Sequence, residues 1–365
     1  MADIQDRIQK LLSALVRDKK ECGIQVAAYY KGRLVVDAWA GLADAKSGKA
    51  VDARTLFPVF STTKGITATV IHLLAERGKL GYEDRISGHW PEFAENGKQD
   101  ITVRQALNHS AGIPQMPDGI GLREVCDWRT MCAAVAKLKP LWTPGSQQEY
   151  HAITYGWILG ELAHRVDGRP FAKIVNEEIC RPLGIVDLYV GAPDEVGPRV
   201  AVLYEPDAAT IMPNNAGAAA IPLWIQPLHE WMNRADARRS CVPASSGVMS
   251  ARAVARHYAA LVPGGVDGVE LLPPARVKVA TVLQNPAGLK EEELPMRIAL
   301  GYLVGGPQSV LGKRASAFGH DGYGGSMGFA DPERGFACGL TKNLFSKNGA
   351  QAHVVGEIRK ALGIL

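Results

Sequence analysis

The sequence has no run of apolar residues long enough to cross a membrane, and no uninterrupted run of Lys and Arg that would form a basic face. Its formal net charge of +4 is small for 365 residues, so neither a nucleic acid nor a membrane surface is expected as a partner. The N-terminal residues lack the apolar stretch of a signal peptide, which predicts a cytoplasmic protein.

Motifs for disulfides and metal ions are also missing. The six cysteines are scattered and form no C-x-x-C pair, which predicts free thiols rather than a disulfide framework. The nine histidines show no H-E-x-x-H or comparable spacing. We therefore expect neither a metal nor another cofactor.

Short β-rich runs are present near both ends of the chain, with helical and loop-like patterns between them. A Gly in residues 31–33 fits a hairpin turn, and Pro and Gly in residues 331–335 fit a second turn. The runs predict strands at residues 24–30, 34–39, 298–304, 326–330 and 336–341.

Apolar residues at helical spacing predict a first helix from Ile4 to Leu15 and a last helix from Val354 to Leu362. Strands at both ends with helices between them predict an α+β fold, in which an antiparallel sheet is flanked by the terminal helices and carries an inserted all-α domain. We assign residues 1–75 and 241–365 to the sheet domain and residues 76–240 to the helical domain. The long Pro- and Ala-rich segment 205–246 is either a loop that shapes a binding site or a packed connection between domains.

Ser61 and Lys64 form the motif S-T-T-K at the start of an apolar helical pattern that a Gly at position 78 ends. If a helix begins at or just before Ser61, the spacing of three residues places both side chains on one face. The lysine amine, or another base that it supports, can then activate the serine hydroxyl as a nucleophile.

Further motifs lie after Ser61 and Lys64 along the chain. Tyr150 opens the run YHAITYGW, and residues 318–325 read FGHDGYGG. Residues 107–114 read LNHSAGIP, and residues 181–184 read RPLG. Together with S-T-T-K, these motifs resemble the serine β-lactamase and penicillin-binding-protein superfamily, most of all its class C β-lactamases, D,D-peptidases and family VIII carboxylesterases. The resemblance runs from about residue 57 to residue 329 and implies the β-lactamase/D,D-peptidase-like fold, with the active site in the cleft between the two domains.

The resemblance also implies a role for each motif residue. Ser61 aligns with the nucleophile, Lys64 with the lysine of the family, and Tyr150 with the tyrosine that acts as the general base or shares that work. A cation beside the phenol would favour its phenolate, so these groups are expected to share protons. The backbone N–H groups of Ser61 and Tyr323 would form the oxyanion hole.

The sequence departs from the family at the substrate-binding positions. Ala152 stands where the family has Asn, and His320, Asp321 and Gly322 stand where it has Lys-Thr-Gly. We expect Gly322 to let a substrate approach closely, His320 to hydrogen-bond rather than to carry protons, and Asp321 to repel an anionic substrate. These departures favour uncharged acyl groups over the carboxylate-bearing substrates of lactamases and peptidases.

A second serine motif offers an alternative nucleophile. Residues 324–328 read GGSMG, the G-x-S-x-G pattern of α/β-hydrolases, with Asp331 and His353 following in the chain order of that fold. That motif needs a strand before the serine and a helix after it. Because a turn and another strand follow here, Ser326 is expected to be a strand residue.

The sequence thus predicts a serine hydrolase that acts on carboxylic esters through an acyl-Ser61 intermediate. Its partner would be a small-molecule ester or thioester. An acyltransferase with the same acyl-enzyme remains an alternative, followed by a β-lactamase or a D-aminopeptidase, and then by a non-catalytic scaffold. The oligomeric state cannot be inferred from the residues.

Overall fold

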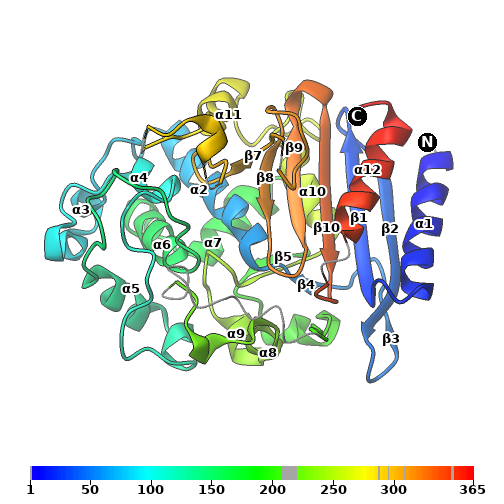
Figure 1. Cartoon of the computed structure of the whole chain (residues 1–365), viewed down its shortest axis with the longest axis horizontal. Coiled ribbons are helices and arrows are strands. Elements are labelled where there is room, and N and C mark those ends of the chain that lie inside the picture. The colour runs from blue at the N-terminus through cyan, green and yellow to red at the C-terminus, as the bar shows by residue number, and fades with distance from the viewer. Residues whose placement is uncertain (1, 207–219, 287, 295, 308, 347–348) are drawn as a thin grey trace.

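The computed structural model describes the chain except for residues 1, 207–219, 287, 295, 308 and 347–348. Its centre is an antiparallel sheet in the order β3-β2-β1-β10-β9-β8-β7, seven strands within the described residues (Figure 1). The strands of this sheet are β1 Gly23–Tyr30, β2 Arg33–Asp44, β3 Lys49–Ala50, β7 Leu303–Val304, β8 Phe318–Asp321, β9 Met327–Asp331 and β10 Phe336–Lys342. The predicted α+β fold is confirmed.

Both faces of the sheet are buried, because helices cover each of them. Alternate residues of β1 enter different cores: Ile24 and Val26 pack with the terminal helices α1 (Ala2–Arg17) and α12 (Ala350–Leu362), whereas Ala27 joins the larger core on the opposite face. Helix α10 (Ala251–Ala259) packs against that opposite face of β1 and β10. Figure 1 shows α1 and α12 side by side at one end of the molecule. The terminal helices therefore flank the sheet as predicted.

The first hairpin was predicted with its turn in the right place. Lys31 and Gly32, which connect β1 to β2, both have positive φ angles, 50° and 73°. A two-residue connection with two left-handed residues matches the right-handed twist of the flanking strands. The predicted turn at 331–335 is a 3₁₀ turn, Pro332–Arg334, closed by Gly335 with φ 61°.

The strand predicted at 298–304 is wrong for most of its length. Only β7, Leu303–Val304, is a strand, because the chain turns back at Gly301 (φ 80°) and Ile298 pairs with Leu303 in an isolated bridge. An added Cβ at Gly301 would lie 2.7 Å from the Tyr155 hydroxyl oxygen and from the Ala68 Cβ. The apolar run therefore fills the core as a turn rather than as an extended strand.

The middle of the chain is mainly helical, as predicted, and it also contributes one strand. β5 (Leu188–Val190) joins β4 (Phe57–Pro58) and β6 (Gly247–Met249) in a separate three-stranded antiparallel sheet. The other α-helices are α2 Thr63–Glu76, α3 Ile86–His89, α4 Val103–Leu107, α5 Trp128–Ala136, α6 Thr154–Asp167, α7 Phe171–Val175, α8 Leu228–Asn233, α9 Ala235–Arg239 and α11 Pro274–Ala280. A π-helical segment spans Asn176–Cys180, and short 3₁₀ segments span Phe60–Thr62, Pro91–Gly97, Glu124–Cys126, Asp194–Arg199, Leu223–Ile225 and Glu291–Glu293.

Helix α2 contacts both β8 and the helices α6 and α7, so it joins the sheet to the helical part. We propose the predicted domain boundaries near residues 75 and 240 on this basis. In the segment 205–246, residues 207–219 lie outside the described residues. The rest of that segment packs against the core through Leu228 and Trp231.

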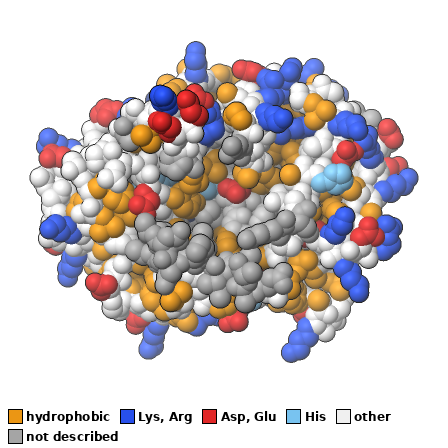
Figure 2. Space-filling view, in the orientation of Figure 1, with side chains coloured by type: hydrophobic (Ala, Val, Ile, Leu, Met, Phe, Trp, Pro, Cys, Tyr) orange, Lys and Arg blue, Asp and Glu red, His pale blue; other side chains and the backbone are white. Residues whose placement is uncertain are grey.

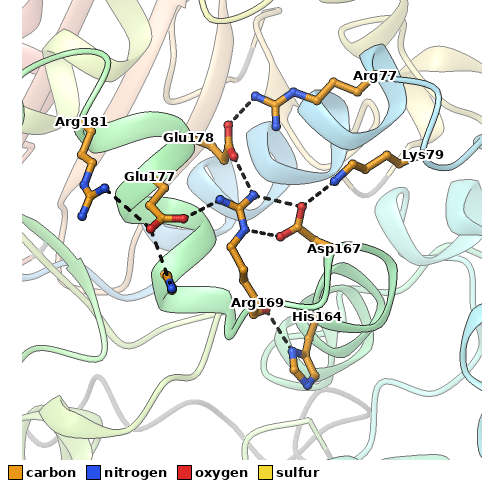
Figure 3. Close-up of polar contacts among 9 residues, drawn as sticks. Arg77, Lys79, His164, Asp167, Arg169, Glu177, Glu178 and Arg181 are labelled. Carbon is orange, nitrogen blue, oxygen red and sulfur yellow. Dashed lines mark hydrogen bonds and ion pairs between the residues drawn. The ribbon is translucent and has the colours of Figure 1, made fainter.

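A network of charged side chains ties the end of α2 to the ends of α6 and α7 (Figure 3). The Arg169 guanidinium donates to the carboxylates of Asp167 (3.0 Å), Glu177 (2.6 Å) and Glu178 (2.6 Å). Lys79 donates to Asp167 at 2.8 Å from the α2 side. The Asp167 carboxylate is buried, and its hydrogen bonds with Arg169 hold its pKa well below the usual range.

Replacing Arg169 by Met should destabilise the fold by about 2–4 kcal/mol, because the buried Asp167 carboxylate would lose its principal partner. Urea unfolding at neutral pH measures this change. Arg181→Met is the matched control: its guanidinium is exposed and lies 3.7 Å from Glu177, so a change below about 0.5 kcal/mol is expected. Equal losses in the two variants would contradict a structural role for the network.

In the described part of the chain, no helix is both long enough and apolar enough to span a membrane. All six cysteines are free thiols, as predicted. On the face shown in Figure 2, charged side chains of both signs lie mostly around the rim and hydrophobic side chains lie nearer the middle.

Candidate active site

Ser61 lies on a single 3₁₀ turn, Phe60–Thr62, that leads directly into α2. The serine is partly exposed, whereas its neighbours on the turn are buried. Phe60 has a φ of 46°, a left-handed conformation that is unfavourable for an aromatic residue. Such strain is often found where a fold fixes a functional side chain. The predicted helix at Ser61 is thus present, with a tighter first turn.

The Lys64 amine is fully buried and has three polar neighbours. Its Nζ lies 3.1 Å from Ser61 Oγ, 2.7 Å from the carbonyl oxygen of Ala152 and 3.0 Å from that of Ala244. Among the described residues no carboxylate lies within 4.0 Å of this amine. Burial without such a partner lowers the pKa of Lys64 well below its ordinary value.

Tyr150 comes to the same place from the segment before α6. The Lys64 Nζ lies 4.8 Å from the centroid of its ring. Burial raises the pKa of Tyr150, and the hydrogen bond of its hydroxyl with Ser61 opposes this shift only in part. We expected Lys64 to stabilise Tyr150 as a phenolate, but the raised pKa favours the protonated phenol in the resting site. Lysine and tyrosine are instead both driven towards their neutral forms by burial.

Two histidines that the sequence analysis did not assign to the site support Tyr150. The His109 ring lies 4.7 Å from the Tyr150 ring and 5.0 Å from the Tyr155 ring, with which it stacks. Its Nδ1 accepts the backbone N–H of His151 at 3.0 Å. Burial lowers the pKa of both imidazoles, that of His151 to about 4. These neutral rings keep water and charge away from one side of Tyr150.

His320 and Asp321 end strand β8 beside Tyr150. The His320 Nδ1 lies 2.6 Å from the backbone carbonyl of Asp321, which makes Nδ1 the protonated nitrogen of a neutral ring. Nε2 is then an acceptor and lies 3.5 Å from the Tyr150 hydroxyl oxygen. Burial lowers the pKa of His320 to about 3. The Asp321 side chain is 41% exposed, and its carboxylate lies 3.9 Å from His320 Nδ1.

Gly322 begins the turn that connects β8 to β9, and its lack of a side chain has a structural reason. A Cβ there would lie 2.1 Å from the carbonyl oxygen of Val59 and 3.0 Å from Thr62 Oγ1. The glycine therefore lets the turn approach the backbone that carries Ser61. Tyr323 follows within this turn, and its hydroxyl donates to Glu205 at 2.6 Å.

The alternative nucleophile has a different environment. Ser326 is buried directly before β9, and its hydroxyl donates to the carbonyl oxygen of Val59 at 2.8 Å. It also lies 3.1 Å from Thr62 Oγ1. No helix follows it; β9 does. Ser326 therefore braces the Ser61 turn instead of standing on a strand-to-helix turn.

A sequence model of the Beta-lactamase family matches residues 8–362. The chain belongs to the Beta-lactamase family. No group of three or more His, Cys, Asp or Glu side chains in the described part of this Beta-lactamase family chain is arranged to hold a metal ion.

Known Beta-lactamase family members and solved structures resemble the chain over most of its length. Esterase/beta-lactamase LipL of Mycobacterium tuberculosis is 34% identical over 347 residues, which cover 88% of this chain and 77% of LipL. A crystal structure of a family VIII carboxylesterase has a TM-score of 0.88 at 29% identity and covers 98% of this chain and 97% of its own. A penicillin-binding protein homolog from Caulobacter crescentus has a TM-score of 0.87 at 35% identity, with coverage of 100% and 98%.

Proposed function

We propose that the protein is a carboxylesterase-type serine hydrolase that forms an acyl intermediate on Ser61. The observation that carries this proposal is the set of three contacts at Lys64. Its amine touches the serine hydroxyl and two backbone carbonyls, those of Ala152 and Ala244. A buried amine in such contact with a partly exposed serine is the arrangement of an activated nucleophile.

The three contacts fit a neutral amine that acts as a base. A neutral Lys64 has two N–H donors, which the carbonyl oxygens of Ala152 and Ala244 accept, and one lone pair. The lone pair then faces Ser61 Oγ and accepts its proton as Oγ bonds to the ester carbonyl carbon. Because burial already lowers the pKa of Lys64, the amine is available as a base at lower pH than an ordinary lysine.

Tyr150 is the proton donor in this scheme. Its high pKa keeps the phenol protonated, and its hydroxyl lies near both Ser61 and His320 Nε2. When the ester C–O bond breaks, the phenol passes its proton to the leaving alkoxide, and the Lys64 ammonium returns a proton to the tyrosine. Water then attacks the acyl-Ser61 carbonyl by the same path in reverse. The two side chains therefore work as one proton-transfer unit.

We propose the backbone N–H groups of Ser61 and Tyr323 as the oxyanion hole. Gly322 supports this assignment, because its closeness to Val59 presses the 322–325 turn against the backbone beside Ser61. Two fixed donors aimed at the developing oxyanion can account for much of the rate enhancement in acyl transfer.

The relatives and the site together support esters as the substrate class. LipL is named an esterase/β-lactamase, and the matching crystal structure is that of a carboxylesterase. Where the resemblance leads us to expect a lysine, this chain has His320, which is buried and neutral, followed by Asp321. Neither side chain can bind a substrate carboxylate.

The free thiols of all six cysteines agree with the predicted cytoplasmic location.

Neutral short-chain esters such as p-nitrophenyl acetate and butyrate should be hydrolysed, whereas penicillins and cephalosporins should be poor substrates. For anionic β-lactams we expect a kcat/KM lower by on the order of 100-fold, because the site lacks a cation for their carboxylate and presents Asp321 instead. Steady-state kinetics with both substrate classes measures the ratio. A β-lactam turned over as efficiently as the best ester would refute the assignment.

The same assay separates hydrolysis from acyl transfer. A hydrolase releases acid at a rate that added alcohols or amines do not change. A transferase accumulates the acyl-enzyme until an acceptor arrives, which intact mass spectrometry detects as an acyl-sized increase on the peptide that contains Ser61.

A further inference from the structure

A cavity of about 630 Å³ opens at the end of β8, where Asp321 forms part of its wall. Among the described residues, the rest of the wall comes from residues 291, 292, 294, 296 and 297, from β7 and from residues 307, 309 and 310. Much of this wall is apolar; the apolar side chains are those of Leu294, Met296, Leu303, Val304 and Val310. The volume is within the range of small-molecule sites.

The described residues that line this cavity carry more negative than positive charge. Of the described residues that line it, Glu291, Glu292 and Asp321 are acidic, and Arg297 is the one cation. The Arg297 guanidinium is already occupied, because it pairs with Glu291 and donates to the carbonyl oxygen of Gly305 at 2.8 Å. Glu292 is exposed to solvent. The Asp321 carboxylate is thus the partly buried charge that faces the cavity without a cation.

Asp321 connects the cavity to the catalytic groups. It follows His320 directly, and His320 Nε2 lies 3.5 Å from the Tyr150 hydroxyl. Burial lowers the pKa of Lys64 and raises that of Tyr150, and the negative charge of Asp321 opposes the first shift and adds to the second, so its field reaches the reacting atoms. No Lys or Arg in the described part of the chain forms an ion pair with it, and its nearest charged-type neighbour is the neutral His320.

We propose that Asp321 makes this site select esters that carry an alkylammonium group, with the cationic nitrogen held at the carboxylate and the alkyl groups against the apolar wall of the cavity. The proposal rests on the proposed esterase function. A carboxylate in a partly desolvated cleft attracts a cation and repels an anion more strongly than it would in water. An ammonium with alkyl substituents loses less hydration than a bare ion and also buries apolar surface.

Two pairs of substrates of equal shape test the proposal, because each pair differs only in charge. Acetylcholine and 3,3-dimethylbutyl acetate place the charge on the alcohol side of the ester. Ethyl 4-(trimethylammonio)butanoate and ethyl 5,5-dimethylhexanoate place it on the acyl side. In at least one pair, the wild-type kcat/KM should be roughly three- to tenfold higher for the cationic ester than for the neutral one. This ratio corresponds to the free energy of a single partly exposed ion pair. The preference should weaken as ionic strength rises.

Asp321→Asn keeps the shape of the side chain and should bring the cation-to-neutral ratio of that pair close to one. Glu195→Gln, which removes an exposed carboxylate on a distant 3₁₀ segment, is the control for net charge and should keep the wild-type ratio. If the neutral esters are hydrolysed but neither pair shows a higher kcat/KM for its cationic member, this inference is overturned and the esterase function stands. A preference that survives in Asp321→Asn, or disappears equally in Glu195→Gln, would also overturn it. If none of the four esters is hydrolysed, the esterase function itself fails.

Discussion

Replacing Ser61 by Ala should abolish ester hydrolysis, with a fall in kcat of about 10⁴-fold or more, because a covalent intermediate can no longer form. Ser326→Ala should keep most of the activity. The Ser326 hydroxyl is buried against the Val59 carbonyl and Thr62, so its loss weakens the support of the Ser61 turn without removing the nucleophile. Both variants are compared with wild type on the same neutral ester.

A fluorophosphonate probe provides an independent measurement of the nucleophile. It should label wild type and Ser326→Ala on the peptide that contains Ser61, and should leave Ser61→Ala unlabelled. Circular dichroism of the three proteins shows whether each is folded. A folded Ser326→Ala without activity, beside an active Ser61→Ala, would refute both the nucleophile and the mechanism built on it.

Local patterns in the sequence were sufficient to predict the parts of the site that lie on one element. The spacing of Ser61 and Lys64 placed both on one helical face, and the structure brings Nζ to 3.1 Å from Oγ. The sheet was predictable for a similar reason. Alternating and apolar runs identified β1, β9 and β10 to within one residue at each end, because hairpin turns with Gly and Pro bound them, whereas β2 continues to Asp44, five residues beyond its predicted end.

Contacts that depend on tertiary structure could not be predicted in this way. The Ala244 carbonyl binds Lys64 across 180 residues, and a backbone carbonyl has no sequence signature. His109 stood within a motif that the resemblance had already marked, yet the position of its ring, 4.7 Å from that of Tyr150, depends on a left-handed backbone (φ 62°) that the sequence does not reveal. The close approach of Gly322 to Val59 and Thr62 was not predicted either, because it joins residues far apart in the sequence. The ionisation of Tyr150 was misjudged because burial, which raises its pKa, is a property of the fold.

Lys64→Ala and Tyr150→Phe should each lower kcat by about 10²–10⁴-fold, as expected for the loss of a general acid or base. Lys64 takes the proton of Ser61 and Tyr150 gives one to the leaving group, so each step needs the other residue to complete the transfer. Tyr155→Phe is the matched control. Among the described residues, its hydroxyl makes a single hydrogen bond, at 3.5 Å to the backbone carbonyl of Lys64, although its ring centroid lies 5.6 Å from Lys64 Nζ. This variant should retain activity within about tenfold of wild type.

The double variant Lys64→Ala/Tyr150→Phe decides whether the two residues form one unit. If they do, its kcat should be little lower than that of the weaker single variant, because the proton path is already broken by one change. Independent contributions would instead multiply, giving a further loss of about 10²-fold or more.

The pH profile gives a second readout. A neutral Lys64 base makes kcat/KM rise with pH through the lowered pKa of this amine, and the rise should be absent in Lys64→Ala and present in Tyr155→Phe. Multiplicative losses, or a rising limb that survives in Lys64→Ala, would mean that another group takes the Ser61 proton, and the buried imidazoles around Tyr150 would then be the groups to examine.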